Sequence, residues 1–356
     1  MKAYTLERFE KKSVTYRGTE VLDTDSNAKG IPTKAYQRQI GKKGLPGIPN
    51  LTGSFLLITM LGFLFSACRA APSIQPELPG EIQDYSVKID DIRRTARIYV
   101  PSGFQSRKLP VIIVMHGSGS DGQSVAIQSG MSKAAQQRGF IAVYPDAMPL
   151  NPTQRADAEN PRVWSDGTGR GYAGEHPEND LQFIRSLIQH VMEKLPVDEK
   201  EIHIAGFSNG GSMTFRLARE MPDLFSRVAV VAGVSWLEPS DWKRQDLLYI
   251  TGRQDPVIPP NRTIRDLPYS TISRSTSVSQ TLLQWMGQCT STGRNSPQYL
   301  PPELQRKSQQ FSCETHSVQY LELPRTGHVW PGGTDDPVAE LNATTYIVRF
   351  LLDRRG

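Results

Sequence analysis

Residues 202–211 read Ile202-His203-Ile204-Ala205-Gly206-Phe207-Ser208-Asn209-Gly210-Gly211. The apolar run at 202–207 predicts a buried strand, and apolar residues at helical spacing over 209–221 predict a helix. Between the two stands Ser208, in the pattern G-x-S-x-G. A serine placed between a strand and a helix is typical of a nucleophile elbow, a sharp turn that exposes the serine hydroxyl.

The turn requires glycine at both positions, because side chains at Gly206 and Gly210 would collide across it. The helix that follows points its N-terminus at Ser208, where the helix dipole favours developing negative charge. Since the pattern alone also arises by chance, its weight comes from the strand before it, the helix after it and the partners downstream.

An activated serine needs an acid and a histidine, which follow it along the chain in that order. The run Leu247–Thr251 predicts a strand, and Asp255 lies just past its carboxyl end. We therefore expect Asp255 to be the acid. An aspartate before proline is also a common turn former, and Glu238 and Asp241 are weaker rivals for the same role.

The base is expected to be His328, which follows the predicted strand Val318–Leu323. His316 also comes after the acid, but it precedes that strand and would lie at the wrong end of the sheet. Three histidines precede the acid and are interpreted as structural: His176, His190 and His203.

Acyl transfer also requires two N–H donors for the oxyanion. One is expected from the backbone of Asn209, the residue after the nucleophile. The other is expected from Ser118, in the glycine-containing loop after the predicted strand at 111–115. The alternative for this loop is a plain Gly/Ser turn.

Metals, cofactors and nucleic acids are not expected as partners. The histidines lack the spacings of a zinc site, and the chain contains neither a dinucleotide-binding loop nor a Walker A loop. The formal net charge of +5 lies within residues 1–50, which hold ten Lys/Arg and five Asp/Glu, so it does not indicate a nucleic-acid surface.

The folded domain is expected to span residues 83–356, in a chain of 356 residues that is 38% hydrophobic and 22% charged. Two early strands followed by alternating strands and helices predict an α/β-hydrolase fold, with a mostly parallel eight- or nine-stranded sheet and helices on both faces. The expected strands are 85–89, 96–100, 111–116, 140–144, 202–207, 228–232, 247–251 and 318–323.

The N-terminal part is expected to be an export and anchoring segment. Residues 1–50 are interpreted as disordered or as a mis-assigned extension, and 69–82 as a Pro-rich tether. The apolar stretch 51–68 resembles a signal h-region that ends in a lipobox-like Cys68, although Phe65 departs from the usual aliphatic residue. The alternative is a signal anchor. We therefore expect an exported protein held at a membrane by its N-terminal lipid, or secreted.

Export makes the two remaining cysteines, Cys289 and Cys313, the expected disulfide pair. The alternative is two reduced, buried thiols. The polar stretch Thr290–Ser312 between them has little to bury, so we expect the bond to steady the strand that leads to His328.

With these residues and several further motifs, the domain resembles the polyhydroxybutyrate depolymerase-like esterases, which are close to the feruloyl and acetyl-xylan esterases of carbohydrate esterase family 1. The resemblance runs in family order through Arg97–Pro101, His116-Gly117, Gly139-Phe140, Tyr144–Asp146, Asn179–Ile184, Gly206–Met213, Pro222–Phe225, Gly252, Asp255, Pro259 and Gly327–Gly333.

This resemblance implies the triad Ser208, Asp255 and His328 and the oxyanion donors of Ser118 and Asn209. The family often has Cys where this chain has Ser118, which matters little because the backbone donates. Trp164 resembles a family tryptophan near the acyl pocket, and Trp330 is expected to line the same cleft because it lies beside the histidine; packing aromatics are the alternative for both.

The expected activity is two-step hydrolysis of carboxylic esters without a cofactor. No polymer-binding module is expected after the histidine, which favours soluble feruloyl or acetyl saccharide esters or short hydroxyalkanoate oligomers. An acyltransferase, a peptidase and a non-catalytic binding protein of the same fold are the alternatives.

Overall fold

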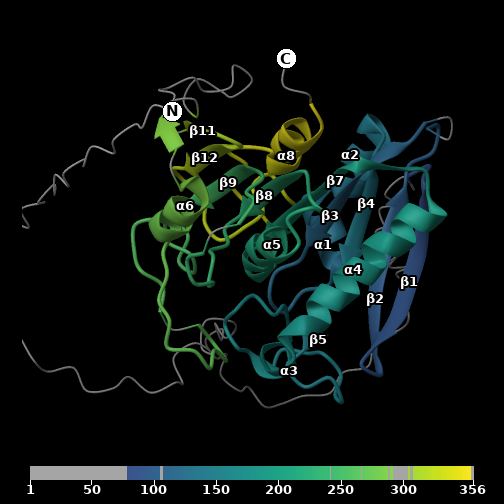
Figure 1. Ribbon diagram of the computed structural model, residues 1–356, viewed down its shortest axis with the longest axis horizontal. Coiled ribbons are helices and arrows are strands. Elements are labelled where there is room, and N and C mark those ends of the chain that lie inside the picture. Colours follow the sequence, from purple (N-terminus) through teal and green to yellow (C-terminus); the bar gives the residue numbers. More distant parts are fainter. Residues whose placement is uncertain are drawn as a thin grey trace, which may run out of the picture. The chain divides into compact units, whose positions relative to one another are not determined.

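The computed structural model describes residues 78–104, 107–240, 242–265, 267–287, 289–291, 304 and 308–353. The strands are β1 (Glu81–Ile89), β2 (Ile92–Val100), β3 (Leu109–Met115), β4 (Ile141–Pro145), β5 (Met148–Pro149), β6 (Arg162–Val163), β7 (Val197–Phe207), β8 (Arg227–Val231), β9 (Asp246–Gly252), β10 (Cys289–Ser291), β11 (Ser308–Cys313) and β12 (Ser317–Leu323). The helices are α1 (Gly122–Ser129), α2 (Met131–Arg138), α3 (Gly171–Glu175), α4 (Pro177–Lys194), α5 (Asn209–Glu220), α6 (Val278–Met286) and α8 (Ala343–Leu352) (Figure 1).

The main sheet of the described residues has ten strands in the order β1-β2-β4-β3-β7-β8-β9-β12-β11-β10. The six central strands, from β4 to β12, run parallel. Antiparallel pairs close both edges, β1 with β2 on one side and β10 with β11 on the other. The predicted α/β-hydrolase class is confirmed. The strand number exceeds the expected eight or nine because β10 and β11 pair within a stretch whose polar sequence predicted a loop.

The central strands are apolar on both faces because helices cover both sides of the sheet. In β3, Val111 and Ile113 pack into a core with α4, α5 and α6. The alternate residues Ile112 and Val114 pack into a second core with α1, α2 and α8. The two-residue period of a strand therefore divides one apolar run between two cores.

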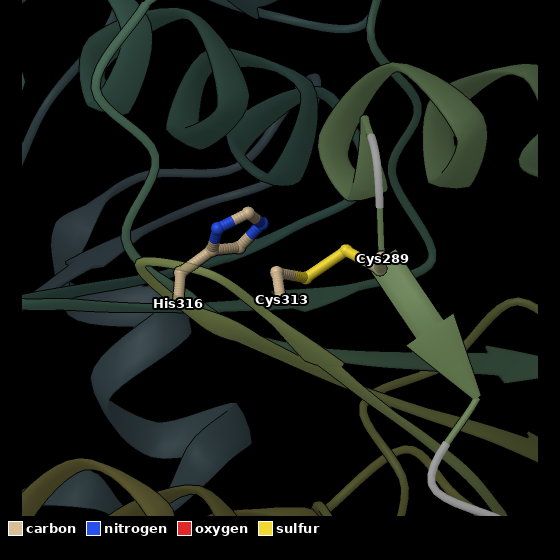
Figure 2. Close-up of side chains that lie close together, drawn as sticks. All are labelled: Cys289, Cys313 and His316. Carbon is tan, nitrogen blue, oxygen red and sulfur yellow. A yellow bond between two sulfur atoms is a disulfide. The ribbon is translucent and has the colours of Figure 1, made fainter.

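The predicted disulfide between Cys289 and Cys313 is present and links neighbouring antiparallel strands. The two residues are directly opposite each other in the β10–β11 register, and their Cα atoms are 4.2 Å apart. Figure 2 shows the disulfide with His316 beside it. Since β11 pairs with β12, the bond closes the edge of the sheet next to the strand that leads to His328.

The predicted h-region and Cys68 lie outside the described residues, as does the tether up to residue 77. The last two residues assigned to the tether, 81 and 82, begin strand β1. Within the part of the chain that the structure describes, no helix has the length and apolarity needed to span a membrane.

Candidate active site

The turn between β7 and α5 has the geometry of a nucleophile elbow. Ser208 has φ 54° and ψ −122°, a conformation that costs energy in a non-glycine residue and persists only where the surroundings enforce it. A Cβ on Gly206 would collide with the Gly210 carbonyl oxygen, and one on Gly210 would collide with the backbone carbonyls of Met115 and His116. The two glycines therefore let the turn close and let the neighbouring strand approach it.

The three predicted triad residues lie in one hydrogen-bonded row. The Nε2 atom of His328 lies 2.8 Å from Ser208 Oγ, and its Nδ1 atom lies 2.7 Å from Asp255 Oδ2. Ser208 follows β7, Asp255 follows β9, and His328 follows β12. Because these strands are parallel, their carboxyl ends meet at one edge of the sheet, which brings together residues that are far apart in sequence.

Asp255 is fixed from both sides. Its other oxygen, Oδ1, accepts hydrogen bonds from the backbone N–H groups of Val257 and Ile258, each at 2.7 Å. The side chain has no exposed surface. The rival Glu238 instead forms an ion pair with Arg274 and is largely exposed, whereas Asp241 lies outside the described residues.

Among the described residues, His328 is the histidine that is hydrogen-bonded to Ser208, and the other histidines have other contacts. His316 contacts the carbonyl of Trp285 and lies next to the disulfide. The ligand atoms of Cys289, Cys313 and His316 lie within 4.8 Å of one another, but the two sulfurs are bonded to each other and are not thiolates. The other three have structural contacts: His176 with Tyr172, His190 with Tyr85, and His203 with Glu201.

The loop after β3 passes directly over the nucleophile. A Cβ on Gly117 would lie 3.3 Å from the Cβ of Ser208. His116 shapes this loop: its Nε2 accepts the N–H of Ala147 at 3.0 Å, so Nδ1 carries the proton and donates to the Gly117 carbonyl at 2.7 Å. Burial lowers the pKa of the His116 imidazole, which favours this neutral form.

The two expected oxyanion donors belong to this loop and to the start of α5. The Ser118 N–H donates to no acceptor among the residues that the structure describes. Asn209 is the first residue of α5, where a helix leaves its N–H groups without intrahelical partners. Both groups are therefore available to a ligand oxygen beside Ser208.

A pocket of about 310 Å³ opens at Ser208. Most of the residues that line it carry polar side chains, and Gln128 donates to Asp335 at 2.8 Å on one side. The lining residues are Gly117, Ser118, Ser120, Ser124, Gln128, Phe207, Ser208, His328, Thr334 and Asp335. A larger hollow of about 920 Å³ shares Thr334 and includes the exposed apolar side chains Leu78, Ile82 and Ile127.

The two tryptophans predicted to line the cleft are absent from its walls, and neither has exposed surface. Trp330 packs in the α8 core and donates its indole N–H to Thr344 at 2.9 Å. The indole of Trp164 donates to the His116 carbonyl at 3.0 Å. Burial thus makes both side chains inaccessible to a ligand, and the cleft-lining prediction is corrected to a packing role.

Sequence reasoning missed a buried polar cluster behind the elbow. Asp166 accepts hydrogen bonds from the Asn209 side chain at 2.7 Å and from Arg170 at 3.0 Å, and it is also bonded to Thr168. The motif Asp166-Gly-Thr168 signals a turn and nothing more. The contact with Asn209 crosses 43 residues, which no local pattern encodes.

Comparisons with known proteins show which family and which proteins the chain is similar to. The family model Esterase, described as "Putative esterase", matches residues 88–322. Feruloyl esterase B of Thermothelomyces thermophilus is 30% identical over 183 residues, which cover 51% of this chain and 56% of that protein. "Putative esterase NocK" of Nocardia uniformis is 27% identical over 241 residues, covering 63% of this chain and 66% of that protein.

Among solved structures, an acetyl xylan esterase from Aspergillus awamori aligns with a TM-score of 0.47 and 15% identity, over 71% of this chain and 95% of that chain. The chain spans less than two thirds of the length of the two curated relatives named above.

Proposed function

Because this chain belongs to the Esterase family, we propose that it hydrolyses carboxylic esters through an acyl-enzyme, with Ser208 as nucleophile, His328 as general base and Asp255 as the acid. The observation that carries the proposal is the single row of hydrogen bonds from Asp255 through His328 to Ser208, at 2.7 and 2.8 Å. A non-catalytic binding protein would have no need of this row.

In the first step, the lone pair on His328 Nε2 takes the Ser208 proton while Oγ attacks the ester carbonyl carbon. The carbonyl oxygen becomes an oxyanion and is stabilised by the N–H groups of Ser118 and Asn209. The C–O bond to the alcohol then breaks, and the alcohol leaves with the proton held by His328. Asp255 stabilises the imidazolium that forms between these events.

In the second step, water replaces the alcohol. His328 takes a proton from the water, whose oxygen attacks the acyl carbon bound to Ser208. A second oxyanion forms against the same two N–H groups. Its collapse breaks the bond to Ser208, which recovers its proton from His328, and the free acid is released.

The pocket walls support a hydroxylated substrate. Hydroxyl groups of serine and threonine, together with Gln128 and Asp335, can exchange hydrogen bonds with a sugar or with a hydroxyacid chain. The adjoining hollow, with its apolar Leu78, Ile82 and Ile127, adds room for an apolar group on the same molecule. We therefore favour soluble feruloyl or acetyl saccharide esters, or short hydroxyalkanoate oligomers.

A panel of esters tests both the activity and the substrate class. Purified full-length protein is assayed with acetyl, butyryl and feruloyl esters, hydroxybutyrate oligomers and a peptide, with product analysis for acyl transfer. Ser208→Ala should lower kcat by about 10⁴-fold or more, and Ser279→Ala, on the exposed face of α6, should have no effect. More than about a tenth of the activity left in Ser208→Ala would rule out the mechanism.

Export is a separate part of the proposal. It is supported by the apolar stretch 51–68 and by the Cys289–Cys313 disulfide, a bond typical of oxidising compartments. The protein should fractionate with membranes, and Cys68→Ala should abolish labelling by a lipid precursor. Recovery of the wild-type protein in the cytosolic fraction, without lipid, would refute export.

A further inference from the structure

Trp164 contacts both halves of the expected oxyanion hole. Its indole N–H donates to the carbonyl of His116 at 3.0 Å, two residues before Ser118. Its backbone N–H donates to the side-chain Oδ1 of Asn209 at 2.7 Å. The segments that supply the two donors come from different strands, and one residue bonds to each of them.

The loop that carries Ser118 is also tied on its other side. Gly119 donates its N–H to the carbonyl of Arg162 at 2.8 Å. Trp164 therefore binds the loop just before Ser118, and Arg162 binds it just after. With these bonds in place, rotation of the loop away from Ser208 would break a hydrogen bond at either end.

The Asn209 side chain is held in a single orientation. Its Oδ1 accepts from Trp164, while its Nδ2 donates to the buried carboxylate of Asp166 at 2.7 Å. Arg170 holds the same carboxylate at 3.0 Å. A flipped amide would face an N–H donor with its own NH₂ group and a carboxylate with its oxygen, so both contacts would become repulsive.

Oxyanion donors stabilise a transition state only if they are already in position when the charge develops. We propose that Trp164 is a positioning residue that fixes the spacing between the Ser118 and Asn209 N–H groups, through its indole on one side and its backbone on the other. The inference rests on the proposed function. Trp164 does not touch the substrate, since its side chain has no exposed surface.

The test replaces the indole without emptying its site. Trp164→Phe removes the N–H that reaches His116 and keeps an aromatic ring. The matched control is Trp285→Phe, because the buried Trp285 also donates its indole N–H to a main-chain carbonyl at 3.0 Å. That carbonyl belongs to Gln245, which precedes β9 and so lies at the opposite end of this strand from Asp255. Both variants lose one buried indole hydrogen bond of the same kind.

With 4-nitrophenyl acetate, kcat of Trp164→Phe should fall roughly 10- to 100-fold, as expected for displaced rather than deleted donors, while KM stays within about threefold. Trp285→Phe should keep kcat within about twofold. Affinity for a phenylboronic acid should fall in parallel with kcat. Its boron bonds to Ser208 Oγ, the serine proton passes to His328, and the anionic adduct occupies the oxyanion site.

A second variant covers the case in which Trp164→Phe does not fold. Asn209→Ala keeps the Asn209 backbone donor but removes the acceptor that holds Trp164, and it should also lower kcat and boronate affinity together. Unchanged kcat in Trp164→Phe or, where that variant does not fold, in Asn209→Ala overturns the inference, as does a fall in kcat with unchanged boronate affinity. An inactive wild-type protein, or an active Ser208→Ala variant, would instead refute the proposed function.

Discussion

At the scale of single residues, Asp255 uses its two oxygens for different purposes. Oδ1 accepts the backbone N–H groups of Val257 and Ile258, which fix the carboxylate. Oδ2 faces Nδ1 of His328. Because an ionised carboxylate can only accept, it selects the tautomer with the proton on Nδ1 and leaves the Nε2 lone pair facing Ser208.

The variant Asp255→Asn tests this selection. The amide oxygen should stay with the two backbone N–H groups, so the NH₂ group would face His328. A donor there favours the tautomer that carries its proton on Nε2, which cannot accept the Ser208 proton. We expect kcat to fall by roughly 10³- to 10⁴-fold, the loss typical of this substitution in serine hydrolases.

Thermal unfolding of Asp255→Asn serves as a control for its folding. Its Tm should stay close to that of the wild-type protein because the two backbone contacts remain. Activity within tenfold of wild type would mean that Asp255 does not set the tautomer. In that case another acid would have to be sought among the residues near His328.

At the scale of elements, strand β12 is held by two different neighbours. On one side it pairs with the parallel strand β9, in the centre of the sheet. On the other side it pairs with β11, which the Cys289–Cys313 bond links to β10. The disulfide is thus two strands away from β9 and at the opposite end of β12 from His328.

Removing the disulfide should therefore lower stability without changing the chemistry. For the 24-residue separation between the cysteines, the chain-entropy model gives roughly 3 kcal/mol in the free energy of unfolding. We expect the free energy of unfolding of the variant with both cysteines replaced by serine to be lower by about that amount, which appears as a lower urea midpoint. Its kcat should stay within about twofold of the wild-type value.

Cys68→Ala is the matched control, since it removes the one cysteine that lies outside the hairpin in the sequence, and it should leave the urea midpoint unchanged. A double serine variant as stable as the wild type would show that the β10–β11 hairpin holds without its covalent link. A large fall in kcat at full stability would instead show that the hairpin helps to place His328.

At the scale of the whole molecule, the fold buries two imidazoles completely. His203 lies within β7, His116 follows β3, and neither has exposed surface. Burial lowers the pKa of both rings, an effect that Glu201 partly opposes at His203. In the unfolded chain both regain a pKa near 6.5.

The sign of the pH dependence follows from proton binding. Below about pH 6.5 the unfolded chain binds protons that the folded protein does not, so stability should fall as the pH falls. Each imidazole should contribute at most about 1.4 kcal/mol per pH unit, and above pH 6.5 neither should contribute. Urea unfolding at pH 5, 6, 7 and 8 measures this slope.

His203→Gln separates this effect from the titration of carboxylates, because it removes one of the two rings and leaves His116 and the active site in place. The variant should lose less stability than the wild type between pH 6.5 and pH 5. Equal slopes for the two proteins would show that His203 takes up no proton on unfolding in this range.

Most of the fold, and the order of the triad, could be predicted from the sequence because they rest on local patterns. Continuous β-branched runs such as 111–114 identify strands buried on both faces, and each predicted triad residue follows such a run directly. In a parallel sheet, residues just past the carboxyl ends of the strands all lie at the same edge of the sheet. The spatial meeting of Ser208, Asp255 and His328 therefore follows from three local features.

The sequence by itself thus determined the elbow, the strands of the central sheet and the choice of Cys289 and Cys313 as the disulfide pair. Only the tertiary structure decided that Trp164 is buried behind the loop that carries Ser118 rather than in the cleft, that Asp166 holds Asn209, and that Gln128 meets Asp335 in the wall of the pocket. The physical reason is that burial and hydrogen-bond partners depend on which surfaces the packed helices and loops bring together. These contacts join residues 43 to 207 positions apart, where the chain carries no periodic signal.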